Sequence, residues 1–569
     1  MTGTGRTWLK TILLLAGLAF GWPGFAARIA MLGVSPGLAL YAGLFLLLLA
    51  CLWGAAFIAR GWLRWGWALV FALATLFVDS FQAATADAMS YDAFVTMTQS
   101  AAFAGDALAQ HGGEMAWAGA GALLLFIAIG MRPGPRRPLP AWLAAAAPVA
   151  GLSLLSILLF VRGGEGGRGL PGAWVGTAYS LLYGWEAVSD PARPREDVRL
   201  VPRPAPDSGT DLGDIVLIVD ESIAARYLDI NDPAGVRSGL ARPPAGVGVA
   251  NFGVAASITN CSYGSNMTLR HGGTRGAYRR INATMPSLFA YAKRAGFGTV
   301  YIDAQRGGGA YQNGMDDRER RDIDRFVQFD AVPVADRDRA AADALVATLH
   351  NGRRDVVLVN KMGAHFPVAD KYPADRMRYR PALPRGRTAA VTEMQLPENL
   401  VTGAESWRRY RNSYRNTLLW TVGGFFDRLF AGGVPAGTLI VYTSDHGQTL
   451  HERGDAGTTT HCSPAPAPEE GAVPLVVIGG DDAWAAAARR HFDATSHYRI
   501  FPTLLAAMGY DKGAVRRLYG PGLDAPARDP LTFNARFNAR LGRGPLWVAI
   551  RPKALPAPPA QDTPAATPD

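Results

Sequence analysis

The feature that most restricts the fold is a series of long apolar segments within roughly the first 165 residues. About five of them are long enough to cross a hydrocarbon core roughly 30 Å thick. They are centred on residues 8–30, 37–59, 65–83, 115–130 and 141–161. Beyond about residue 211 the chain has the composition of a soluble domain. We therefore expect an N-terminal α-helical membrane domain over residues 1–165, with about five transmembrane helices.

Basic residues lie at alternate ends of these segments. Two precede the first segment, two separate the second from the third, and three separate the fourth from the fifth, whereas the other two connections have none. The residues are Arg6, Lys10, Arg60, Arg64, Arg132, Arg136 and Arg137. The positive-inside rule then places the N-terminus in the cytoplasm. An odd number of spans then places everything after Arg162 outside the cytoplasmic membrane.

Three other segments are less apolar. Residues 79–114 are interpreted as either a surface loop or an interfacial helix lying against the outer leaflet. Residues 166–212 contain a stretch rich in Trp and Tyr, typical of an interfacial helix, and then a linker rich in proline and charge. Residues 546–569 are rich in Pro and Ala, and we expect a disordered tail.

Residues 213–545 alternate short Val- and Ile-rich runs with segments of helical spacing. The apolar runs occupy residues 214–221, 298–303, 355–362, 437–447 and 472–480. Runs that are apolar on both faces are typical of buried parallel strands. The alternation predicts an α/β domain with a mostly parallel sheet covered by helices.

Acidic residues and histidines follow several of these predicted strands. The carboxyl ends of parallel strands meet at one edge of a sheet, so we expect these side chains to converge. Carboxylates and imidazoles together suit Zn²⁺, with Mn²⁺ or another divalent cation as an alternative. The residues concerned are Asp220, Glu221, Asp303, His365, Asp445 and His446.

The stretch SITNCSYGSNMTLRHGG, residues 257–273, is too polar for a core strand and too irregular for an amphipathic helix. It offers serine, threonine and tyrosine hydroxyls. A divalent cation lowers the pKa of a hydroxyl and so generates a nucleophile at neutral pH without a nearby general base. We therefore expect one of these hydroxyls to be activated by the metal.

Five motifs, IVLIVDES, NCSYGSN, NKMGAHFPVADKYP, YTSDHGQTL and THCSP with VPLVV, occur in that order. In order and spacing they resemble the alkaline phosphatase superfamily, and within it the membrane-anchored phosphoethanolamine transferases, with sulfatases as more distant relatives. The resemblance spans essentially the whole chain. It implies a multi-pass protein of the bacterial inner membrane, with five membrane spans, an interfacial region and a periplasmic sulfatase-like catalytic domain.

The resemblance also implies roles for single residues. Glu221 matches the metal-binding glutamate after the first strand, and Asp445 and His446 match the metal-binding Asp-His pair. His365 and His461 are similar to family histidines, which implies that they bind the phosphoryl group, the donor headgroup or a second zinc.

Asp220 departs from the transferases, which usually have glycine at this position, and is similar to the paired aspartates of sulfatases. We expect either an additional metal ligand or a solvated acid there.

Two alignments of NCSYGSN give different nucleophiles. Matching Cys261 to the cysteine of the transferases places Tyr263 at the position of their threonine, whereas the sulfatase pattern, nucleophile-x-x-Ser, selects Ser262 with Ser265 three residues on. We predict Ser262 as the nucleophile and as a metal ligand, because a small aliphatic hydroxyl can lie on the metal and attack in line. Asn266 is expected to shape the turn or to bind phosphate. Asp303 is a further candidate for the substrate or a second metal.

The resemblance implies a metal-dependent transfer of a phospho-headgroup in two displacements through phosphorylated Ser262. The expected donor is a membrane phospholipid, phosphatidylethanolamine, and the expected acceptor is a cell-surface glycolipid such as lipid A or a glycan. The alternatives are a membrane-tethered hydrolase of phosphodiesters or sulfate esters and a non-catalytic scaffold that binds lipid or glycan.

Cysteine content and charge add two further expectations. Cys261 and Cys462 are either disulfide-bonded, which an oxidising compartment permits, or two buried thiols. The net charge of +10 is scattered without an evident basic helix or stripe. It therefore favours an anionic membrane or glycolipid surface over a nucleic acid partner.

Overall fold

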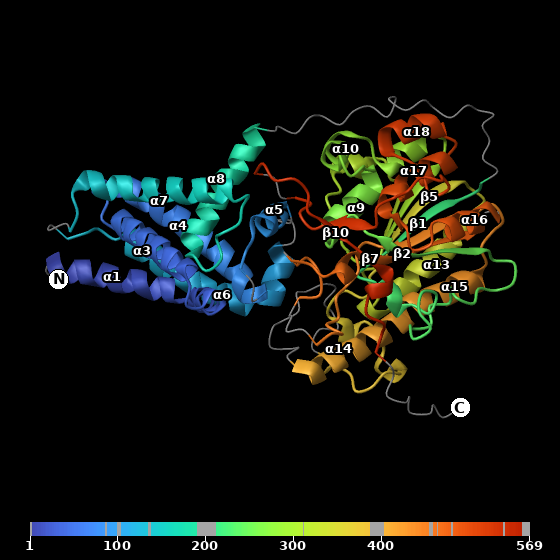
Figure 1. Ribbon diagram of the computed structural model, residues 1–569, viewed down its shortest axis with the longest axis horizontal. Helices are drawn as coiled ribbons and strands as arrows, with labels where there is room; N and C mark the ends of the chain where they lie inside the picture. Colours follow the sequence, from blue (N-terminus) through green and yellow to red (C-terminus); the bar gives the residue numbers. More distant parts are fainter. Residues whose placement is uncertain are drawn as a thin grey trace. The chain divides into compact units, whose positions relative to one another are not determined.

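The structure is a computed structural model of the chain (Figure 1). It describes residues 3–85, 88–99, 104–134, 138–189, 212–310, 312–386, 403–454, 459–463, 465–479, 482–538 and 541–559. The chain divides into two compact units. A helical unit comprises Met1–Pro191 with Asn538–Gly544, and a second unit comprises Ala192–Phe537 with Pro545–Asp569.

The helical unit contains the apolar segments found in the sequence. Its helices are α1 (Gly3–Ala19), α2 (Trp22–Leu32), α3 (Pro36–Ala56), α4 (Gly61–Thr85), α5 (Tyr91–Gln99), α6 (Ala104–Gly130), α7 (Ala141–Val161) and α8 (Gly172–Ser189). Within the described residues, four helices are long and apolar enough to cross a membrane, or five if α1 and α2, bent by 65°, form one span. The helical membrane region expected from the sequence is confirmed.

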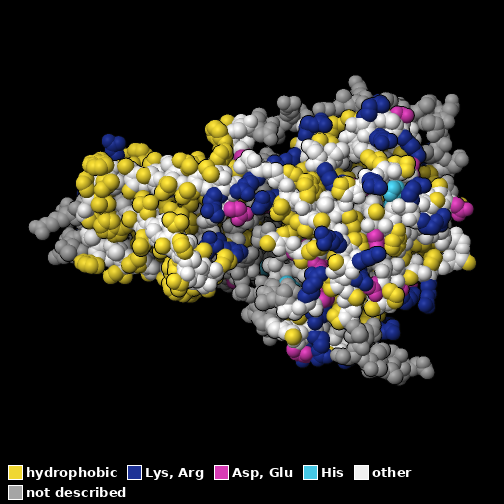
Figure 2. Space-filling model, viewed as in Figure 1, with side chains coloured by type: hydrophobic (Ala, Val, Ile, Leu, Met, Phe, Trp, Pro, Cys, Tyr) yellow, Lys and Arg dark blue, Asp and Glu magenta, His cyan; other side chains and the backbone are white. Residues whose placement is uncertain are grey.

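The surface of this unit is apolar where a water-soluble bundle would be polar. Figure 2 shows hydrophobic side chains spread over its outer face. Leu40 of α3, Trp62 of α4 and Trp142 of α7 are each more than 70% exposed. Side chains of this kind at the surface of a bundle are typical of contact with lipid.

Two segments that the sequence left as less apolar, residues 79–114 and the Trp- and Tyr-rich stretch after α7, are largely helical. Over residues 79–114, α4 continues to Thr85, α5 follows, and α6 begins at Ala104. The surface-loop alternative is therefore wrong for the described part of this segment. The Trp- and Tyr-rich stretch forms α8, and the linker expected after it lies outside the described residues from 190 to 211.

The second unit is built on an eight-stranded sheet in the order β4-β3-β5-β1-β6-β7-β2-β8. The strands are β1 (Ile215–Asp220), β2 (Val249–Ala256), β3 (Gly298–Asp303), β4 (Arg325–Gln328), β5 (Asp355–Asn360), β6 (Leu439–Ser444), β7 (Ala472–Gly479) and β8 (Thr495–Ser496). β1 lies between β5 and β6 and is parallel to both, while β7 is antiparallel to its two neighbours. The predicted mostly parallel α/β sheet is confirmed.

Alternate residues of the central strand face two separate cores. Val216 and Ile218 pack with α13 (Arg337–Leu349), α14 (Gly403–Leu418) and α15 (Gly424–Gly432). Ile215 and Leu217 pack on the other face with α11 (Leu288–Arg294), α17 (Ile500–Ala507) and α18 (Lys512–Tyr519). Because both faces of β1 are covered, its apolar run is continuous, as in other buried parallel strands.

The end of the chain differs from the expected disordered tail. Residues Trp547–Ala549 form β10, which pairs antiparallel with β9 (Thr532–Asn534). Ile550 and Leu555 are buried against Phe533. The prediction of disorder from residue 546 was wrong for residues 546–559, because extended, proline-rich backbone can pair and pack at an edge. Residues 560–569 lie outside the described part.

Candidate active site

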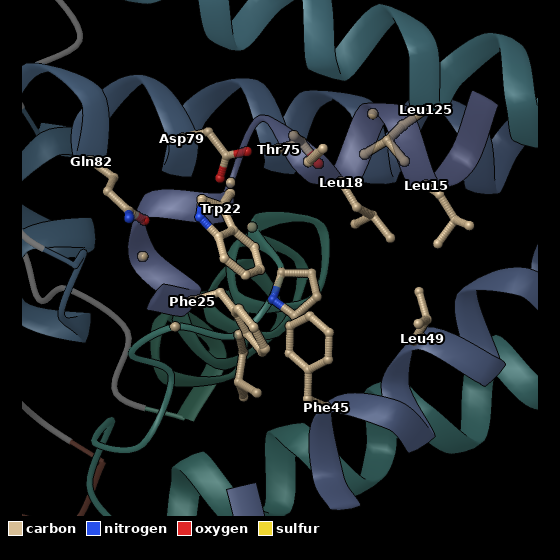
Figure 3. Close-up of a pocket in the computed structure, with 18 residues that line it drawn as sticks. Leu15, Leu18, Trp22, Phe25, Phe45, Leu49, Thr75, Asp79, Gln82 and Leu125 are labelled. Atoms are coloured by element: carbon tan, nitrogen blue, oxygen red, sulfur yellow. The ribbon is translucent and has the colours of Figure 1, made fainter. Parts of the chain in front are cut away.

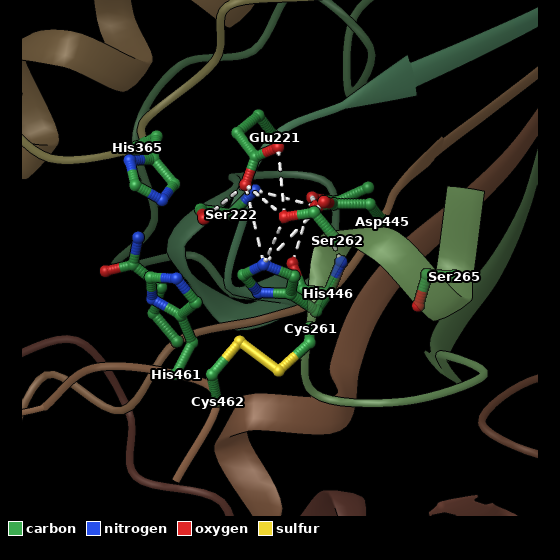
Figure 4. Close-up of polar contacts among 12 residues, drawn as sticks. Glu221, Ser222, Cys261, Ser262, Ser265, His365, Asp445, His446, His461 and Cys462 are labelled. Carbon is green, nitrogen blue, oxygen red and sulfur yellow. Dashed lines mark hydrogen bonds and ion pairs between the residues drawn. A yellow bond between two sulfur atoms is a disulfide. The ribbon is translucent and has the colours of Figure 1, made fainter. Parts of the chain in front are cut away.

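Glu221, Asp445 and His446 form a buried cluster at the carboxyl ends of β1 and β6 (Figure 4). Asp220 is in register with Ser444, so the residues that follow leave the sheet side by side. One ligand atom from each of the three side chains lies within 4.8 Å of the other two. The convergence predicted from strand ends is therefore present in the structure.

His446 is oriented by its own backbone. Its Nδ1 lies 2.8 Å from the carbonyl oxygen of Gly447, to which it can donate a hydrogen bond. Its Nε2 faces the carboxylates, 3.4 Å from Glu221 Oε1 and 3.6 Å from Asp445 Oδ2. This is the usual arrangement of a metal-binding histidine, in which one ring nitrogen is anchored and the other is free to coordinate.

The charges of the cluster are not balanced by the chain. Burial raises the pKa of Asp445 to about 8, and the neighbouring Glu221 carboxylate adds to the rise. Burial also disfavours ionised Glu221, but the hydrogen bond with His446 and the charges of His365 and His446 hold its pKa below the usual range. Burial would lower the pKa of His446, but Asp445 and Glu221 raise it to about 9.

If both carboxylates were ionised, the single imidazolium of His446 would not balance them, and the raised pKa of Asp445 reflects this. A divalent cation would supply the missing positive charge and allow both carboxylates to be ionised. The donor set of two oxygens and one nitrogen, with room for further ligands, fits Zn²⁺. Glu221, Asp445 and His446 are therefore the candidate ligands.

Ser222, which sequence reasoning missed, helps to hold both carboxylates. Its backbone has a φ of 62°, which is uncommon for a residue with a side chain. In this conformation its N–H donates to Asp445 Oδ1 at 3.0 Å, and its hydroxyl donates to Glu221 Oε1 at 2.8 Å. Nothing in the residue type signals this role, which follows from the turn after β1.

Asp220 is neither a solvated acid nor a member of the cluster. It is buried and pairs with Lys361 Nζ, and it accepts a hydrogen bond from Tyr442 Oη at 3.1 Å. Lys361 also lies 3.7 Å from Asp338. Asp220 is the last residue of β1, and its oxygens also accept the N–H of Glu221, so their partners are groups of the chain other than the side chains of the cluster. Its oxygens bind a cation of the chain itself, which corrects both readings of this residue.

Ser262 is the first residue of α9 (Ser262–His271) and lies against the cluster. Its Oγ is 3.3 and 3.4 Å from the two Glu221 oxygens and 3.2 Å from His446 Nε2. Asn266, one turn further along α9, donates to the Ser262 carbonyl at 3.1 Å and lies 3.5 Å from Asp445 Oδ2. The N-terminal N–H groups of a helix also favour a phosphate at this end.

The other hydroxyls of the segment have different partners. Tyr263 packs against Gly314. Ser265 is buried, and its hydroxyl lies 3.2 Å from the carbonyl oxygen of Thr259. Ser257 also donates to the carbonyl of Thr259. Of these hydroxyls, Ser262 is the one that the structure brings to the cluster, which favours the sulfatase-like alignment.

Two further histidines adjoin the cluster (Figure 4). The ring of His461 lies 4.6 Å from that of His446 and 5.0 Å from that of His365, between centroids. Burial lowers the pKa of His461 well below its ordinary value, and the neighbouring imidazoles add to this effect. A neutral imidazole at this place can bind a ligand through a ring nitrogen.

A disulfide joins the two segments that carry Ser262 and His461. Cys261 and Cys462 are bonded across 201 residues, with Cα atoms 4.9 Å apart. Each cysteine is the chain neighbour of a candidate site residue. The disulfide therefore ties the start of α9 to the loop that holds His461.

Asp303 lies outside the cluster and acts through a residue that sequence reasoning missed. Its Oδ1 accepts hydrogen bonds from the Gln305 N–H and from Asn360, both at 3.0 Å. Gln305 in turn donates to Glu221 Oε2 at 3.2 Å. Gln305 follows β3, so the rule that located the other strand-end residues could have found it.

Comparisons with known proteins agree with this geometry. The sulfatase family model matches residues 249–510. These residues are therefore similar to a sulfatase domain. No curated protein sequence matches the chain. The recognition from sequence motifs is confirmed for this part of the molecule.

Solved structures extend the likeness to the membrane region. The integral membrane lipooligosaccharide phosphoethanolamine transferase A (EptA) of Neisseria meningitidis is similar over 89% of this chain and 96% of its own, with a TM-score of 0.60 and 17% identity. At this identity the match establishes a shared fold, helical region included. The zinc complex of the periplasmic domain of Escherichia coli EptC is 16% identical and covers 63% of this chain and 99% of its own, with a TM-score of 0.46.

Proposed function

We propose that this protein is a membrane-anchored, metal-dependent transferase. It moves a phospho-headgroup, phosphoethanolamine from phosphatidylethanolamine, to a cell-surface glycolipid such as lipid A or to a glycan. The observation that carries the proposal is the position of the Ser262 hydroxyl, within 3.4 Å of Glu221 and His446 at the start of a helix. The fold shared with a phosphoethanolamine transferase that includes a membrane region supports the choice of a lipid donor.

In the proposed reaction, the phospho-headgroup moves first to Ser262 and then to the acceptor, in two displacements at phosphorus. Ser262 Oγ forms a bond to the phosphorus of the donor while the bond from phosphorus to the diacylglycerol oxygen breaks, and that oxygen takes up a proton. An acceptor hydroxyl or phosphate oxygen then bonds to the phosphorus, and the bond to Ser262 breaks. His461, whose ring lies beside those of His446 and His365, would bind the phosphoryl group or the headgroup between these steps.

Glu221, Asp445 and His446 would hold a divalent cation, Zn²⁺ by the chemistry of the donor set. When bound it would lower the pKa of the serine hydroxyl and stabilise charge on the phosphoryl oxygens. Ser222 and Gln305 keep the carboxylates in place for it. The distribution of basic residues supports a periplasmic site, and a disulfide suits that oxidising compartment.

A hydrolase that uses water as the acceptor is the second candidate, because the sulfatase family match covers the site segment. A formylglycine mechanism is disfavoured, since Ser262 is followed by YGSN rather than by the usual Pro and Arg. A scaffold without catalysis would have no use for two buried carboxylates that repel each other.

Transfer can be tested with purified protein in liposomes containing phosphatidylethanolamine labelled in its headgroup, with lipid A as acceptor. We expect label on the peptide that contains Ser262, label on lipid A, and release of diacylglycerol. Ser262→Ala should lose the adduct and several orders of magnitude in turnover, whereas Tyr263→Phe should keep both. Free labelled phosphoethanolamine at the same rate with and without acceptor would identify a hydrolase. Intact donor under all conditions would overturn the proposal.

A further inference from the structure

The helical unit contains a cavity of about 310 Å³ beside the bend between α1 and α2 (Figure 3). The bend follows from the sequence, because Gly21 precedes α2 and Pro23 cannot donate a hydrogen bond to continue α1. Backbone that leaves helical geometry at membrane depth is tolerated where it lines a cavity. The broken helix and the cavity are therefore parts of one feature.

The wall of the cavity has an apolar part and a polar part (Figure 3). The apolar part includes Leu15 and Leu18 of α1, Phe45 and Leu49 of α3, and Leu125 of α6. The polar part is one face of α4, with Thr75, Asp79 and Gln82. These three residues follow each other at helical spacings of four and three, so they lie on the same side of the helix.

Asp79 is a carboxylate in a membrane-spanning helix without a partner of its own. Among the described residues, no hydrogen-bond donor or cation pairs with it. Gly172 leaves room for its side chain, because a methyl group there would lie 2.3 Å from Asp79 Oδ1. The hydroxyl of Thr75, one turn away, is buried and also lacks a partner within the described chain. A carboxylate inside the membrane is costly, so an unpaired one points to a ligand that pairs with it.

A cation with an unsatisfied nitrogen is found next to the same wall. The stem of Arg28 packs against Gly169, which lines the cavity. Its Nε is buried and has no acceptor in the described part of the chain. Asp79 lines the mainly apolar cavity, and Arg28 lies beside it, touching its wall at Gly169, so one charge of each sign is found in or next to the cavity.

We infer that this cavity binds a lipid whose headgroup combines an ammonium with a phosphate. Asp79, Thr75 and Gln82 accept hydrogen bonds from the ammonium, Arg28 binds the phosphate, and an acyl chain lies along the leucines of α1 and α3. In the proposed orientation Asp79 is six residues, or about 9 Å, from the outer end of α4, which is the depth of a headgroup drawn slightly into the membrane.

The inference depends on the proposed function only in one respect, namely whether the bound lipid is the donor of the transfer reaction. The bound molecule is either the donor of the transfer reaction or a resident lipid that stays in place. Binding is therefore measured without turnover, in the full chain carrying Ser262→Ala, so that failure of the transfer reaction and failure of the lipid site give different results.

The test compares binding of phosphatidylethanolamine and phosphatidylglycerol with identical acyl chains to the full chain in detergent, by native mass spectrometry. We expect a preference for phosphatidylethanolamine that falls about tenfold in Asp79→Asn, because the amide carries no charge to bind the ammonium. Glu114→Gln removes an exposed carboxylate of the same unit and should leave the preference unchanged. Equal binding of the two lipids by the Ser262→Ala protein overturns the inference. So does an unchanged preference for phosphatidylethanolamine in the Asp79→Asn variant, provided that the variant is folded, as an unchanged melting temperature shows.

A second variant tests the shape of the cavity. Leu49→Trp fills part of the apolar side of the cavity and should lower the binding of both lipids. The lipid that still binds should show the same preference for phosphatidylethanolamine over phosphatidylglycerol. In protein with Ser262 intact, a raised KM for the lipid donor in Asp79→Asn identifies the bound lipid as the donor. An unchanged KM identifies a resident lipid, and either result retains the site.

Discussion

Each end of α9 lies against buried carboxylate groups, and the two sites differ in how many cationic side chains face each carboxylate. At the first residue, Ser262 contacts Glu221 and His446, where two carboxylates share one imidazole. At the last turn, Arg270 Nε lies 2.9 Å from Glu319 Oε1, and His271 Nε2 lies 3.2 Å from Glu319 Oε2. Here the single carboxylate has a guanidinium of its own.

The pKa values reflect this difference. Burial would raise the pKa of Glu319, but Arg270 and His271 lower it to about 2. Asp445, which has no such cation, has its pKa raised to about 8. Burial of a carboxylate is therefore no evidence of a site by itself. A deficit of positive charge at the cluster, together with a reactive hydroxyl, distinguishes the candidate metal centre from a structural ion pair.

The largest effect is expected from neutralising one carboxylate at the Ser262 end of α9, where two carboxylates share one imidazole. Asp445→Asn removes a candidate ligand but keeps an oxygen that can accept the Ser222 N–H. We expect turnover and bound zinc to fall by more than the roughly 100-fold that loss of a group supporting a metal ligand costs. The melting temperature of metal-free protein should stay the same or rise, because one of two mutually repelling carboxylates is gone. Elemental analysis and thermal unfolding measure both, and undiminished zinc would contradict the assignment.

Neutralising Glu319, at the Arg270 end of α9, should lower the stability of the protein instead. Glu319→Gln leaves Arg270 and His271 buried without their counter-charge, and we expect a loss of about 3–5 kcal/mol in unfolding free energy. Zinc content per folded molecule should stay the same.

This second prediction also has a pH dependence. The folded pKa of Glu319 lies below its ordinary value of 4.5, so the contribution of its charge is complete above pH 4.5 and is lost as the pH falls toward about 2. The stability difference between native protein and Glu319→Gln should therefore shrink over that window. A constant difference in denaturant titrations at each pH would count against the ion pair as its cause.

The convergence of Glu221 and Asp445 was predictable because Val- and Ile-rich runs show where β1 and β6 end, and parallel neighbours place those ends side by side. It misjudged Asp220 because the partner, Lys361, follows a different strand and lies on the other face. Strand β2 has an Ala- and Gly-rich sequence, so its place in the sheet depends on pairing with β7 and β8 rather than on local pattern. Ser222 takes its role from the geometry of the turn after β1, which composition does not encode, whereas Gln305 follows the end of β3 and could have been found by the strand-end rule.

The smallest expected effect concerns the hydroxyl that shares a helical turn with Ser262. Ser265→Ala removes a buried contact with the Thr259 carbonyl, so we expect a loss of about 1 kcal/mol in stability and less than a tenfold change in turnover. Thr268→Val, which removes a hydroxyl that donates to Asn282 nearer the other end of α9, is the matched control and should behave alike. If Ser265→Ala abolished turnover while Thr268→Val did not, the reactive oxygen would lie at Ser265. The site at the Ser262 end of α9 would then extend one turn further into the helix, and the contact of Ser262 with the carboxylates would be a hydrogen bond that orients Glu221 rather than the position of a nucleophile.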